Sequence, residues 1–352
     1  MLGVVFTGNR QLEVREFPRP EPGYGEVRLR IMATGICGSD LHVYRADQVP
    51  GQIAGHEPSG VVDAVGPGCE RLQVGDRVSA HHHQGCGTCH QCARGEVVAC
   101  ARDQVVGVAT GGSFAEYCVV KERNCVPLPD SVSFTDGAFM ACVGGTAWGA
   151  YKRLGIWPWE SVGVFGLGPV GLSCVLVGKA LGLRVAGMDV LPERLEVGRR
   201  CGADLVVDGA CEEAVAALRE FGRGPAGHWA DGLDYVIETS GATAAREKVI
   251  PSLRREGKAA IVGVGQYDKV INPGEIHGRA CTLLGSVVFH LDWSWDLARF
   301  LATSGLSFEP AVTHRFRLDQ AEEALRLADE GRCGKVLFLP HGPGEVGHPC
   351  LS

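Results

Sequence analysis

The sequence predicts an α/β plus β protein, in which a loop-rich β domain precedes a doubly wound parallel sheet. Two observations favour this division. Residues 1–135 form short β segments separated by glycine and proline, whereas the chain from about residue 150 alternates strand-like and helix-like segments. With 352 residues, the chain is long enough for two domains with separate cores.

The first domain is expected to be all-β. A two-residue period is clear in residues 26–31, where Val27, Leu29 and Ile31 share one face. Glycine contributes 50 of the 352 residues, roughly twice its usual share, which fits many tight turns. The expected β segments are residues 25–35, 59–68, 75–83 and 113–120.

The second domain is expected to contain βαβ units, because apolar strand-like runs are followed by segments of helical period. Predicted strands cover residues 161–166, 184–190, 233–241 and 258–265, and predicted helices cover residues 169–182 and 192–202. After Gly285 the pattern loosens, and Trp293 and Trp295 are placed in a loop. A helix over 318–331, a strand over 335–340 and a flexible tail complete the chain.

Composition excludes several classes of protein. The net charge is −7 and there is no long basic tract, which argues against a nucleic-acid-binding surface. The uncharged run at 161–178 contains five glycines and Pro169, so it is interpreted as a strand and a buried helix rather than a membrane span. No signal-peptide pattern opens the sequence, so we expect a cytoplasmic protein.

A glycine-rich turn predicts a dinucleotide site. Gly166, Gly168 and Gly171 follow a predicted strand, and Pro169 and Val170 open a predicted helix. This arrangement lets a pyrophosphate approach the helix N-terminus closely.

The acidic partner of this motif is Asp189, which lies 23 residues after Gly166 at the end of the next strand. Its carboxylate would accept hydrogen bonds from the adenosine ribose and repel a 2′-phosphate, which favours NAD over NADP. Arg194 is a further candidate that would weaken this preference, although an exposed helix residue is the better interpretation.

Cysteines cluster in one loop. Cys86, Cys89, Cys92 and Cys100 have the spacing C-x2-C-x2-C-x7-C. Without an export signal, fifteen cysteines are not expected to form a disulfide framework. Four thiolates close a tetrahedral shell around Zn²⁺, so the loop predicts a structural zinc site; an iron–sulfur cluster is the alternative.

A second metal site is more dispersed. Cys37 lies in GICGSDLH, and His56 and Glu57 lie in AGHEPSG nineteen residues later. A thiolate, an imidazole and a carboxylate beside glycines suit a catalytic zinc ion with an open position. A single Cys or His in such a segment is more often part of the core, so the combination carries the prediction.

Taken in order, GICGSDLH, GHEPSGVVDAVG, the four-cysteine loop and GLGPVG resemble the zinc-dependent medium-chain alcohol dehydrogenases, with the polyol and sorbitol dehydrogenase branch nearest. The resemblance covers residues 1–340. It implies a GroES-like catalytic domain at 1–149 that holds both zinc ions, a Rossmann NAD-binding domain at 150–286, and a return to the catalytic domain with a C-terminal tail at 287–352. It also implies a homodimer or homotetramer.

The resemblance also implies roles for single residues. Cys37, His56 and Cys142 would bind the catalytic zinc, with Glu57 as a neighbour that replaces a ligand during turnover. Polyol dehydrogenases usually carry a glutamate where Cys142 stands. Ser39 would take the proton from the alcohol, and His42 would pass it to solvent. The candidate cofactor contacts implied are Thr146, the Val262–Val264 loop and the Thr239–Gly241 turn.

The implied reaction is hydride transfer between a secondary alcohol and NAD. Ser39 stands where many primary-alcohol enzymes have threonine, and the smaller side chain leaves room for a second carbon substituent. His82 matches a position that is large and apolar in simple alcohol dehydrogenases, which favours a polyol, sugar alcohol or cyclitol. As an alternative to this role, the run His81–His83 ends a strand with one ring inside and two outside.

Other readings stay open. Within enzymes, a simple primary, secondary or aromatic alcohol dehydrogenase is supported by Cys142, and a threonine-type amino-alcohol dehydrogenase comes next. A non-catalytic dinucleotide-binding protein would lack Cys37, His56 or Ser39, and all three are present. A nucleic-acid-binding zinc module is disfavoured by the charge. We expect a small-molecule substrate, with neither nucleic acid nor membrane as a partner.

Overall fold

The computed structural model describes residues 1–224, 231–266 and 271–342. The chain forms two compact units, one of Met1–Gly145 with the chain from Phe289 on, and one of Thr146–Val288. The predicted fold class is confirmed, since one unit is built on a mixed β-sheet and the other on a parallel sheet. The domain limits expected at 149/150 and 286/287 stay a prediction. Within the described residues, no helix is both long and apolar enough to cross a membrane.

The first unit is built on a seven-stranded sheet in the order β14-β15-β3-β4-β5-β7, with β6 paired to β3, and on a two-stranded sheet of β1 and β2. Val27, Leu29 and Ile31 are fully buried, as their alternation predicts. The strands are β1 (Leu2–Gly8), β2 (Gln11–Glu16), β3 (Glu26–Gly35), β4 (Ser59–Val65), β5 (Arg77–Ala80), β6 (Tyr117–Lys121), β7 (Cys125–Pro127), β14 (Val312–Phe316) and β15 (Lys335–Phe338).

The expectation that the first domain is all-β is wrong, because helices connect its strands. They are α1 (Gly38–Arg45), α2 (His90–Ala93), α3 (Phe134–Ala141), α11 (Leu291–Ser304) and α12 (Ala321–Glu330), with single 3-10 turns η1 (Val97–Ala99), η2 (Glu122–Asn124), η3 (Glu309–Ala311) and η4 (Leu318–Gln320). Trp293 and Trp295 lie on α11 rather than in a loop. The Trp293 ring stacks on His290, with the ring centroids 4.1 Å apart.

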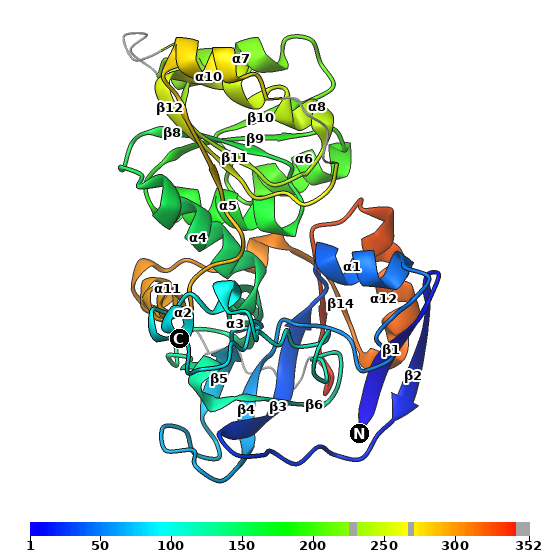
Figure 1. Ribbon diagram of the computed structural model, residues 1–352. Coiled ribbons are helices and arrows are strands. Elements are labelled where there is room, and N and C mark those ends of the chain that lie inside the picture. Colours follow the sequence, from blue (N-terminus) through cyan, green and yellow to red (C-terminus); the bar gives the residue numbers. More distant parts are fainter. Residues whose placement is uncertain (225–230, 267–270, 343–352) are drawn as a thin grey trace. The chain divides into compact units, whose positions relative to one another are not determined.

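The second unit is a six-stranded, fully parallel sheet in the order β10-β9-β8-β11-β12-β13. Figure 1 shows α7 and α10 on one side of this sheet and α4 and α5 on the other. The elements are β8 (Ser161–Phe165), α5 (Pro169–Ala180), β9 (Arg184–Asp189), α6 (Pro192–Arg200), β10 (Leu205–Asp208), α7 (Ala214–Gly222), β11 (Leu233–Glu238), α8 (Thr243–Arg246), α9 (Val249–Ser252), β12 (Leu253–Ile261), α10 (Pro273–Arg279) and β13 (Thr282–Gly285).

Helix α4 (Val143–Leu154) begins in the first unit and continues into the second. In the order β9-β8-β11, the chain moves from β8 to one side through β9, and it later continues on the other side of β8 through β11. The glycine-rich turn after β8 therefore lies at the topological switch point of the sheet. The predicted C-terminal helix and strand are present as α12 and β15. The tail predicted after residue 340 falls almost entirely outside the described residues.

Candidate catalytic and cofactor sites

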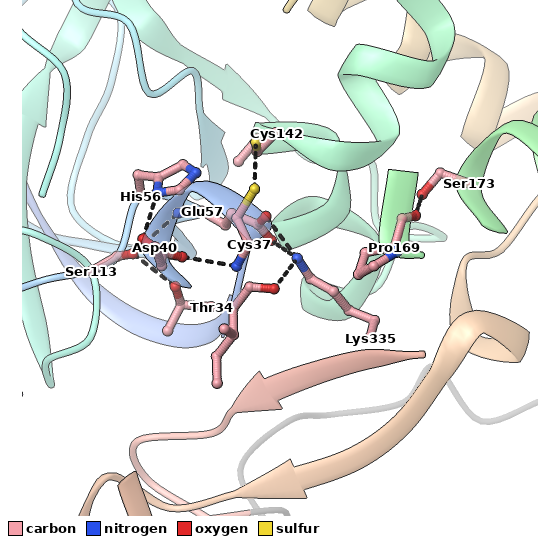
Figure 2. A network of polar contacts seen from close by, with 12 residues as sticks. Thr34, Cys37, Asp40, His56, Glu57, Ser113, Cys142, Pro169, Ser173 and Lys335 are labelled. Atoms are coloured by element: carbon pink, nitrogen blue, oxygen red, sulfur yellow. Dashed lines mark hydrogen bonds and ion pairs between the residues drawn. The ribbon is translucent and has the colours of Figure 1, made fainter. Parts of the chain in front are cut away.

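Four side chains from three separate segments of the sequence meet in the first unit. The ligand atoms of Cys37, His56, Glu57 and Cys142 all lie within 4.8 Å of one another. Figure 2 shows Cys37 at the start of α1 facing Cys142 at the end of α3, with a sulfur–sulfur distance of 3.9 Å. A tetrahedral zinc ion with Zn–S bonds of about 2.3 Å would place two sulfurs about 3.8 Å apart. The donor set and its spacing therefore fit zinc.

Local backbone geometry fixes the two ends of this cluster. Cys37 is the N-cap of α1, directly after β3. His56 follows Gly55, which has φ +87°, and a Cβ on Gly55 would lie 2.2 Å from the Phe114 ring. Only glycine tolerates both the left-handed backbone and this close approach. Gly55 therefore has a steric reason, whereas a Cβ on Gly38, beside Cys37, would meet no atom within 4 Å.

Asp40, which the sequence reasoning missed, orients the imidazole. This buried carboxylate accepts hydrogen bonds from His56 Nδ1 at 2.8 Å and from the Cys37 backbone N–H at 2.8 Å. Because Nδ1 donates to Asp40, Nε2 is the nitrogen left to bind a metal. The signal was available, since Asp40 occupies the N3 position of a helix capped by Cys37.

Lys335 is the second residue that the sequence reasoning missed. Its ammonium group is fully buried on β15 and lies 2.7 Å and 2.6 Å from the two carboxylate oxygens of Glu57 (Figure 2). It also donates to the Ile36 carbonyl at 2.9 Å. Burial raises the pKa of Glu57 to about 7, although Lys335 opposes this shift. A lysine opening an apolar strand was the only signal in the sequence.

The surroundings of Cys37 favour its thiolate form, which is the form that binds metals. A hydrogen bond from Cys142 is the largest effect and outweighs burial, so the pKa of Cys37 lies well below its usual range. The hydrogen bond with Cys37, followed by burial, raises the pKa of Cys142 well above its usual range. Because cysteine binds a metal as the thiolate, a divalent cation at this point would displace any proton held by the two sulfurs.

The proposed proton relay lies at the exposed side of α1. Ser39 Oγ lies 3.3 Å from His56 Nε2, and both Ser39 and His42 are exposed. Among the described residues no hydrogen bond joins Ser39 to His42. The serine is therefore beside the metal-binding nitrogen, whereas the step from Ser39 to His42 remains a prediction.

The run His81–His83 does not have one ring inside and two outside, as the alternative expectation had it. His81 and His82 are both buried, and His83 is half-buried and paired with Asp103 at 2.5 Å. The His82 ring lies 5.1 Å from the His56 ring between centroids, and its Nδ1 donates to the Ala141 carbonyl at 2.8 Å. Burial lowers the pKa of His82 well below its usual range. His82 is therefore a neutral imidazole beside the metal cluster.

The cysteine loop closes into a compact cluster. Sulfur–sulfur distances are 4.0 Å for Cys86–Cys92, 3.5 Å for Cys89–Cys92 and 3.7 Å for Cys89–Cys100. These distances bracket the edge of a tetrahedral zinc–thiolate site and are too long for disulfides. All four ligand positions are protein sulfurs, which fits a closed, structural metal site.

In the second unit, the glycine-rich turn has the geometry its sequence requires. Gly166 has φ +94°, and a Cβ on Gly171 would lie 1.8 Å from the Gly166 carbonyl oxygen. Helix α5 starts with Pro169, and Gly168 is its N-cap. The free amide groups at this helix end suit a pyrophosphate.

Asp189 is held firmly at the end of β9. One carboxylate oxygen accepts from the Leu167 N–H at 2.7 Å, and the other accepts from the Val190 and Leu191 N–H groups at 2.8 Å and 3.1 Å. The expectation that Arg194 is an exposed helix residue is wrong. Its side chain is 25% exposed and its guanidinium lies 3.7 Å from Asp189, so it shares the charge of this carboxylate.

The other predicted cofactor contacts lie at the carboxyl ends of strands or on α4. Thr239 Oγ1 donates to the Gly166 carbonyl at 2.7 Å, which ties the Thr239–Gly241 turn to the glycine motif. Val262 and Val264 follow β12, and Val264 is exposed. Thr146 is buried on α4.

Glu238 was not predicted to matter for this turn. Its buried carboxylate accepts the backbone N–H groups of Ser240 and Gly241 at 2.7 Å and 2.8 Å.

Comparison with known sequences gives two family matches. Residues 23–130 match the alcohol dehydrogenase GroES-like domain, and residues 169–303 match the zinc-binding dehydrogenase domain. The chain is 33% identical over 354 residues to the uncharacterized zinc-type alcohol dehydrogenase-like protein YphC of Escherichia coli, covering 96% of this chain and 98% of that protein. It is 33% identical over 337 residues to L-threonine 3-dehydrogenase of Pyrococcus horikoshii, covering 93% and 94%.

Solved structures give the same picture. An NAD-dependent alcohol dehydrogenase superposes with a TM-score of 0.85 at 30% identity, covering 96% of this chain and 99% of that one. A zinc-binding dehydrogenase of Sinorhizobium meliloti bound to NADP superposes with a TM-score of 0.86 at 27% identity, and the alignment covers 96% of this chain and 99% of that one. Galactitol-1-phosphate dehydrogenase of Escherichia coli superposes with a TM-score of 0.86 at 29% identity, and the alignment covers 97% of this chain and 100% of that one.

Proposed function

The chain belongs to the zinc-binding alcohol dehydrogenase family and is an oxidoreductase; on this basis we propose that it interconverts a secondary alcohol and its ketone by hydride transfer to and from NAD. The observation that carries this proposal is the meeting of Cys37, His56 and Cys142 at one buried point. These three side chains leave a fourth tetrahedral position open, as a catalytic zinc site requires.

We propose that Cys37, His56 and Cys142 hold the catalytic zinc. Glu57 stays beside the zinc ion, held by its ion pair with Lys335. A zinc ion bound there acts as a Lewis acid that lowers the pKa of the substrate hydroxyl. Asp40 holds His56 in the tautomer that presents Nε2. Cys86, Cys89, Cys92 and Cys100 hold a second, structural zinc ion.

Proton transfer is assigned to Ser39, with His42 as the group that exchanges with solvent. Support comes from the 3.3 Å distance between Ser39 Oγ and His56 Nε2, which places the hydroxyl at the metal cluster. The exposure of His42 on the same helix gives the proton a route to water.

For the cofactor we propose NAD in preference to NADP. The Asp189 carboxylate is held in place by three backbone N–H groups, and its negative charge would repel a 2′-phosphate. Because Arg194 partly neutralises Asp189, we expect the preference for NAD to be moderate.

The proposed substrate is a hydroxylated secondary alcohol, such as a polyol, sugar alcohol or cyclitol. The neutral His82 ring uses Nδ1 on Ala141 and leaves Nε2 as a hydrogen-bond acceptor beside the metal cluster. A substrate hydroxyl would satisfy this acceptor, and a purely apolar substrate would not. The galactitol-1-phosphate dehydrogenase structure supports this class.

A threonine-type amino alcohol is the second candidate. The relative from Pyrococcus horikoshii is an L-threonine 3-dehydrogenase, and threonine also carries a secondary hydroxyl. An ammonium group would satisfy the His82 acceptor as well as a hydroxyl does. A simple primary, secondary or aromatic alcohol would leave that acceptor unpaired.

The test is NADH formation by the zinc-loaded protein with polyols, cyclitols, simple alcohols and L-threonine. We expect turnover of a hydroxylated secondary alcohol, loss of turnover in Cys37→Ala, and normal turnover in Cys211→Ala, which changes an exposed cysteine of the other unit. A fully active Cys37→Ala enzyme would refute the catalytic assignment. Turnover confined to simple alcohols would refute the substrate class.

We further propose a homodimer or homotetramer in the cytoplasm. Strand β13 is the last strand of the parallel sheet and has one unpaired edge, which is available for pairing with a second copy. All the described cysteines are free thiols, as expected in a reducing compartment. Light scattering after gel filtration measures the oligomeric state.

A further inference from the structure

The Arg102 side chain reaches one sulfur of the cysteine loop. Its Nη2 donates to Cys86 Sγ at 3.2 Å and to Thr88 Oγ1 at 3.0 Å. The Thr88 backbone N–H also donates to Cys86 Sγ, at 3.5 Å. Arg102 and Thr88 are exposed and Cys86 is half-buried, so these contacts lie at the solvent side of the loop. A cation is thus hydrogen-bonded to one sulfur of the proposed structural zinc site.

The backbone on both sides of Arg102 is tied to the same loop. The Arg102 N–H donates to Cys100 Sγ at 3.4 Å. The next residue, Asp103, accepts the Gly85 N–H at 2.8 Å and pairs with His83 at 2.5 Å. The guanidinium therefore starts from a fixed point beside the four sulfurs, and its contact with Cys86 follows from the fold of the loop.

Charge balance gives this guanidinium a role. Four thiolates around one Zn²⁺ leave two surplus negative charges on the loop. The other arginines nearby are already engaged, because Arg94 pairs with Glu96 at 2.8 Å and Arg123 donates to two backbone carbonyl groups. Within the described part of the chain, Arg102 pairs with no carboxylate. Arg102 is therefore available to balance the charge of the thiolates.

The hydrogen bond to Cys86 has a predictable effect on reactivity. A thiolate is both the metal ligand and the nucleophile. With zinc bound, the Cys86 sulfur would already be a thiolate, so a neighbouring cation cannot increase the thiolate fraction. A charge-assisted hydrogen bond instead draws electron density from the sulfur and lowers its nucleophilicity.

We propose that Arg102 is a positioning residue of the zinc loop, which holds the Cys86 sulfur in place as a metal ligand and protects it from alkylating electrophiles. Thr88 fixes the orientation of the guanidinium through its hydroxyl group. This inference rests on the structural zinc ion proposed above, and it assigns to one side chain the retention of that ion.

The experiment is alkylation of the zinc-loaded protein with iodoacetamide under native conditions, followed by mass spectrometry that locates the first alkyl group. Cys211 is an exposed cysteine of the other unit and serves as the internal reference. Zinc released to a chromogenic chelator is measured in the same samples. We expect the four loop cysteines to react more slowly than Cys211, because the metal holds their electron pairs.

Three variants isolate the guanidinium. Arg102→Met removes the charge and keeps a similar length, so it should raise the alkylation rate of Cys86 about fivefold, with a smaller change at the other loop cysteines and faster zinc release. Arg102→Lys keeps the charge without the planar geometry that contacts both Cys86 and Thr88, and should raise the rate about twofold. Arg94→Met removes an exposed charge from the same loop and should react like the unmodified protein.

Two results would overturn the role of Arg102 and leave the structural zinc ion in place. One is an unchanged Cys86 rate in Arg102→Met. The other is an equal rise at all four loop cysteines, which would indicate a general loosening of the loop. A third result would remove both proposals: in the unmodified protein, all four loop cysteines would react as fast as Cys211.

Discussion

Replacing Lys335 with methionine removes the only positive charge that contacts Glu57 among the described residues. Lys335 and Glu57 are both fully buried, with Nζ 2.7 Å and 2.6 Å from the two carboxylate oxygens. Methionine has a similar length and no charge, so the packing of β15 should survive. The change therefore isolates the electrostatic role of the ammonium group.

Two outcomes compete in the Lys335→Met protein. If Glu57 stays ionised, an unpaired buried charge costs about 3–5 kcal/mol. If Glu57 takes up a proton, the cost at pH 8 is at most about 1.4 kcal/mol, because burial already raises its pKa to about 7 and loss of Lys335 raises this pKa further. Protonation is the cheaper outcome. Adding about 1 kcal/mol for the Ile36 carbonyl left without its donor gives a total loss of about 2–3 kcal/mol.

The pH dependence identifies which outcome occurs. A carboxyl group whose pKa is raised by folding stabilises the protein at low pH, and this stability is lost as the pH rises through the folded pKa. The Lys335→Met protein should therefore become less stable between pH 7 and pH 9. The double variant Lys335→Met with Glu57→Gln has no group to titrate and should show a smaller change over that range.

Calorimetry of the zinc-loaded proteins measures the loss of stability through the melting temperature. At about 2–4 °C per kcal/mol, we expect Lys335→Met to lower the Tm by roughly 5–10 °C at pH 8. Lys179→Met, which breaks the half-exposed ion pair with Asp204, should lower it by less than about 4 °C. A Lys335→Met protein that melts like the Lys179→Met control would refute the reasoning.

Three further predictions concern other sites. Cys86→Ser should reduce the metal content from about two zinc ions per chain to about one and lower the Tm, measured by atomic emission and calorimetry; an unchanged zinc content would refute the structural site. Asp189→Gly should raise kcat/KM for NADP relative to NAD by about tenfold, and an unchanged ratio would contradict its ribose role. Burial, reinforced by His83, lowers the pKa of His81 to about 3, so the unfolded chain binds a proton below about pH 6.5 that the folded protein does not, and stability falls by about 2 kcal/mol at pH 5. His81→Gln should remove this acid loss in pH-dependent melting curves, and an unchanged slope would refute it.

Much of the fold was predictable because its signals are local. The alternation in residues 26–31, the βαβ pattern after residue 160 and the glycine motif each depend on neighbouring residues, and the corresponding elements are present as β3, β8, α5 and β9. Helix α11 was missed because its N-cap is His290 and its first five residues include Asp292 and two tryptophans, which have weak helix propensity. Packing in the folded chain decides the state of such a segment.

The part of the site that could be predicted consists of residues whose type and sequence neighbours indicate metal binding. Cys37 and His56 were recognisable because a thiol and an imidazole beside glycines suit metals, whereas Cys142 was implied by the resemblance to the alcohol dehydrogenases. Lys335 was not recognisable, because its role depends on contacts that only the tertiary fold creates. For Asp40 the sequence offered the helix cap but not the contact with His56. A lysine in the sequence is normally a solvated surface residue, and nothing local indicates that β15 buries this one beside Glu57.

Charge balance explains why the cluster needs that lysine. With a metal bound as proposed, Cys37 and Cys142 would be thiolates, and the fully buried Glu57 would add a third negative charge beside them. A divalent cation neutralises two of these charges, and Lys335 neutralises the third. Without Lys335, Glu57 could stay ionised only as a surplus negative charge, which would raise the pKa of a hydroxyl at the open position and weaken the Lewis acid. Lys335 thus allows a carboxylate to lie close to the catalytic centre without opposing the chemistry proposed there.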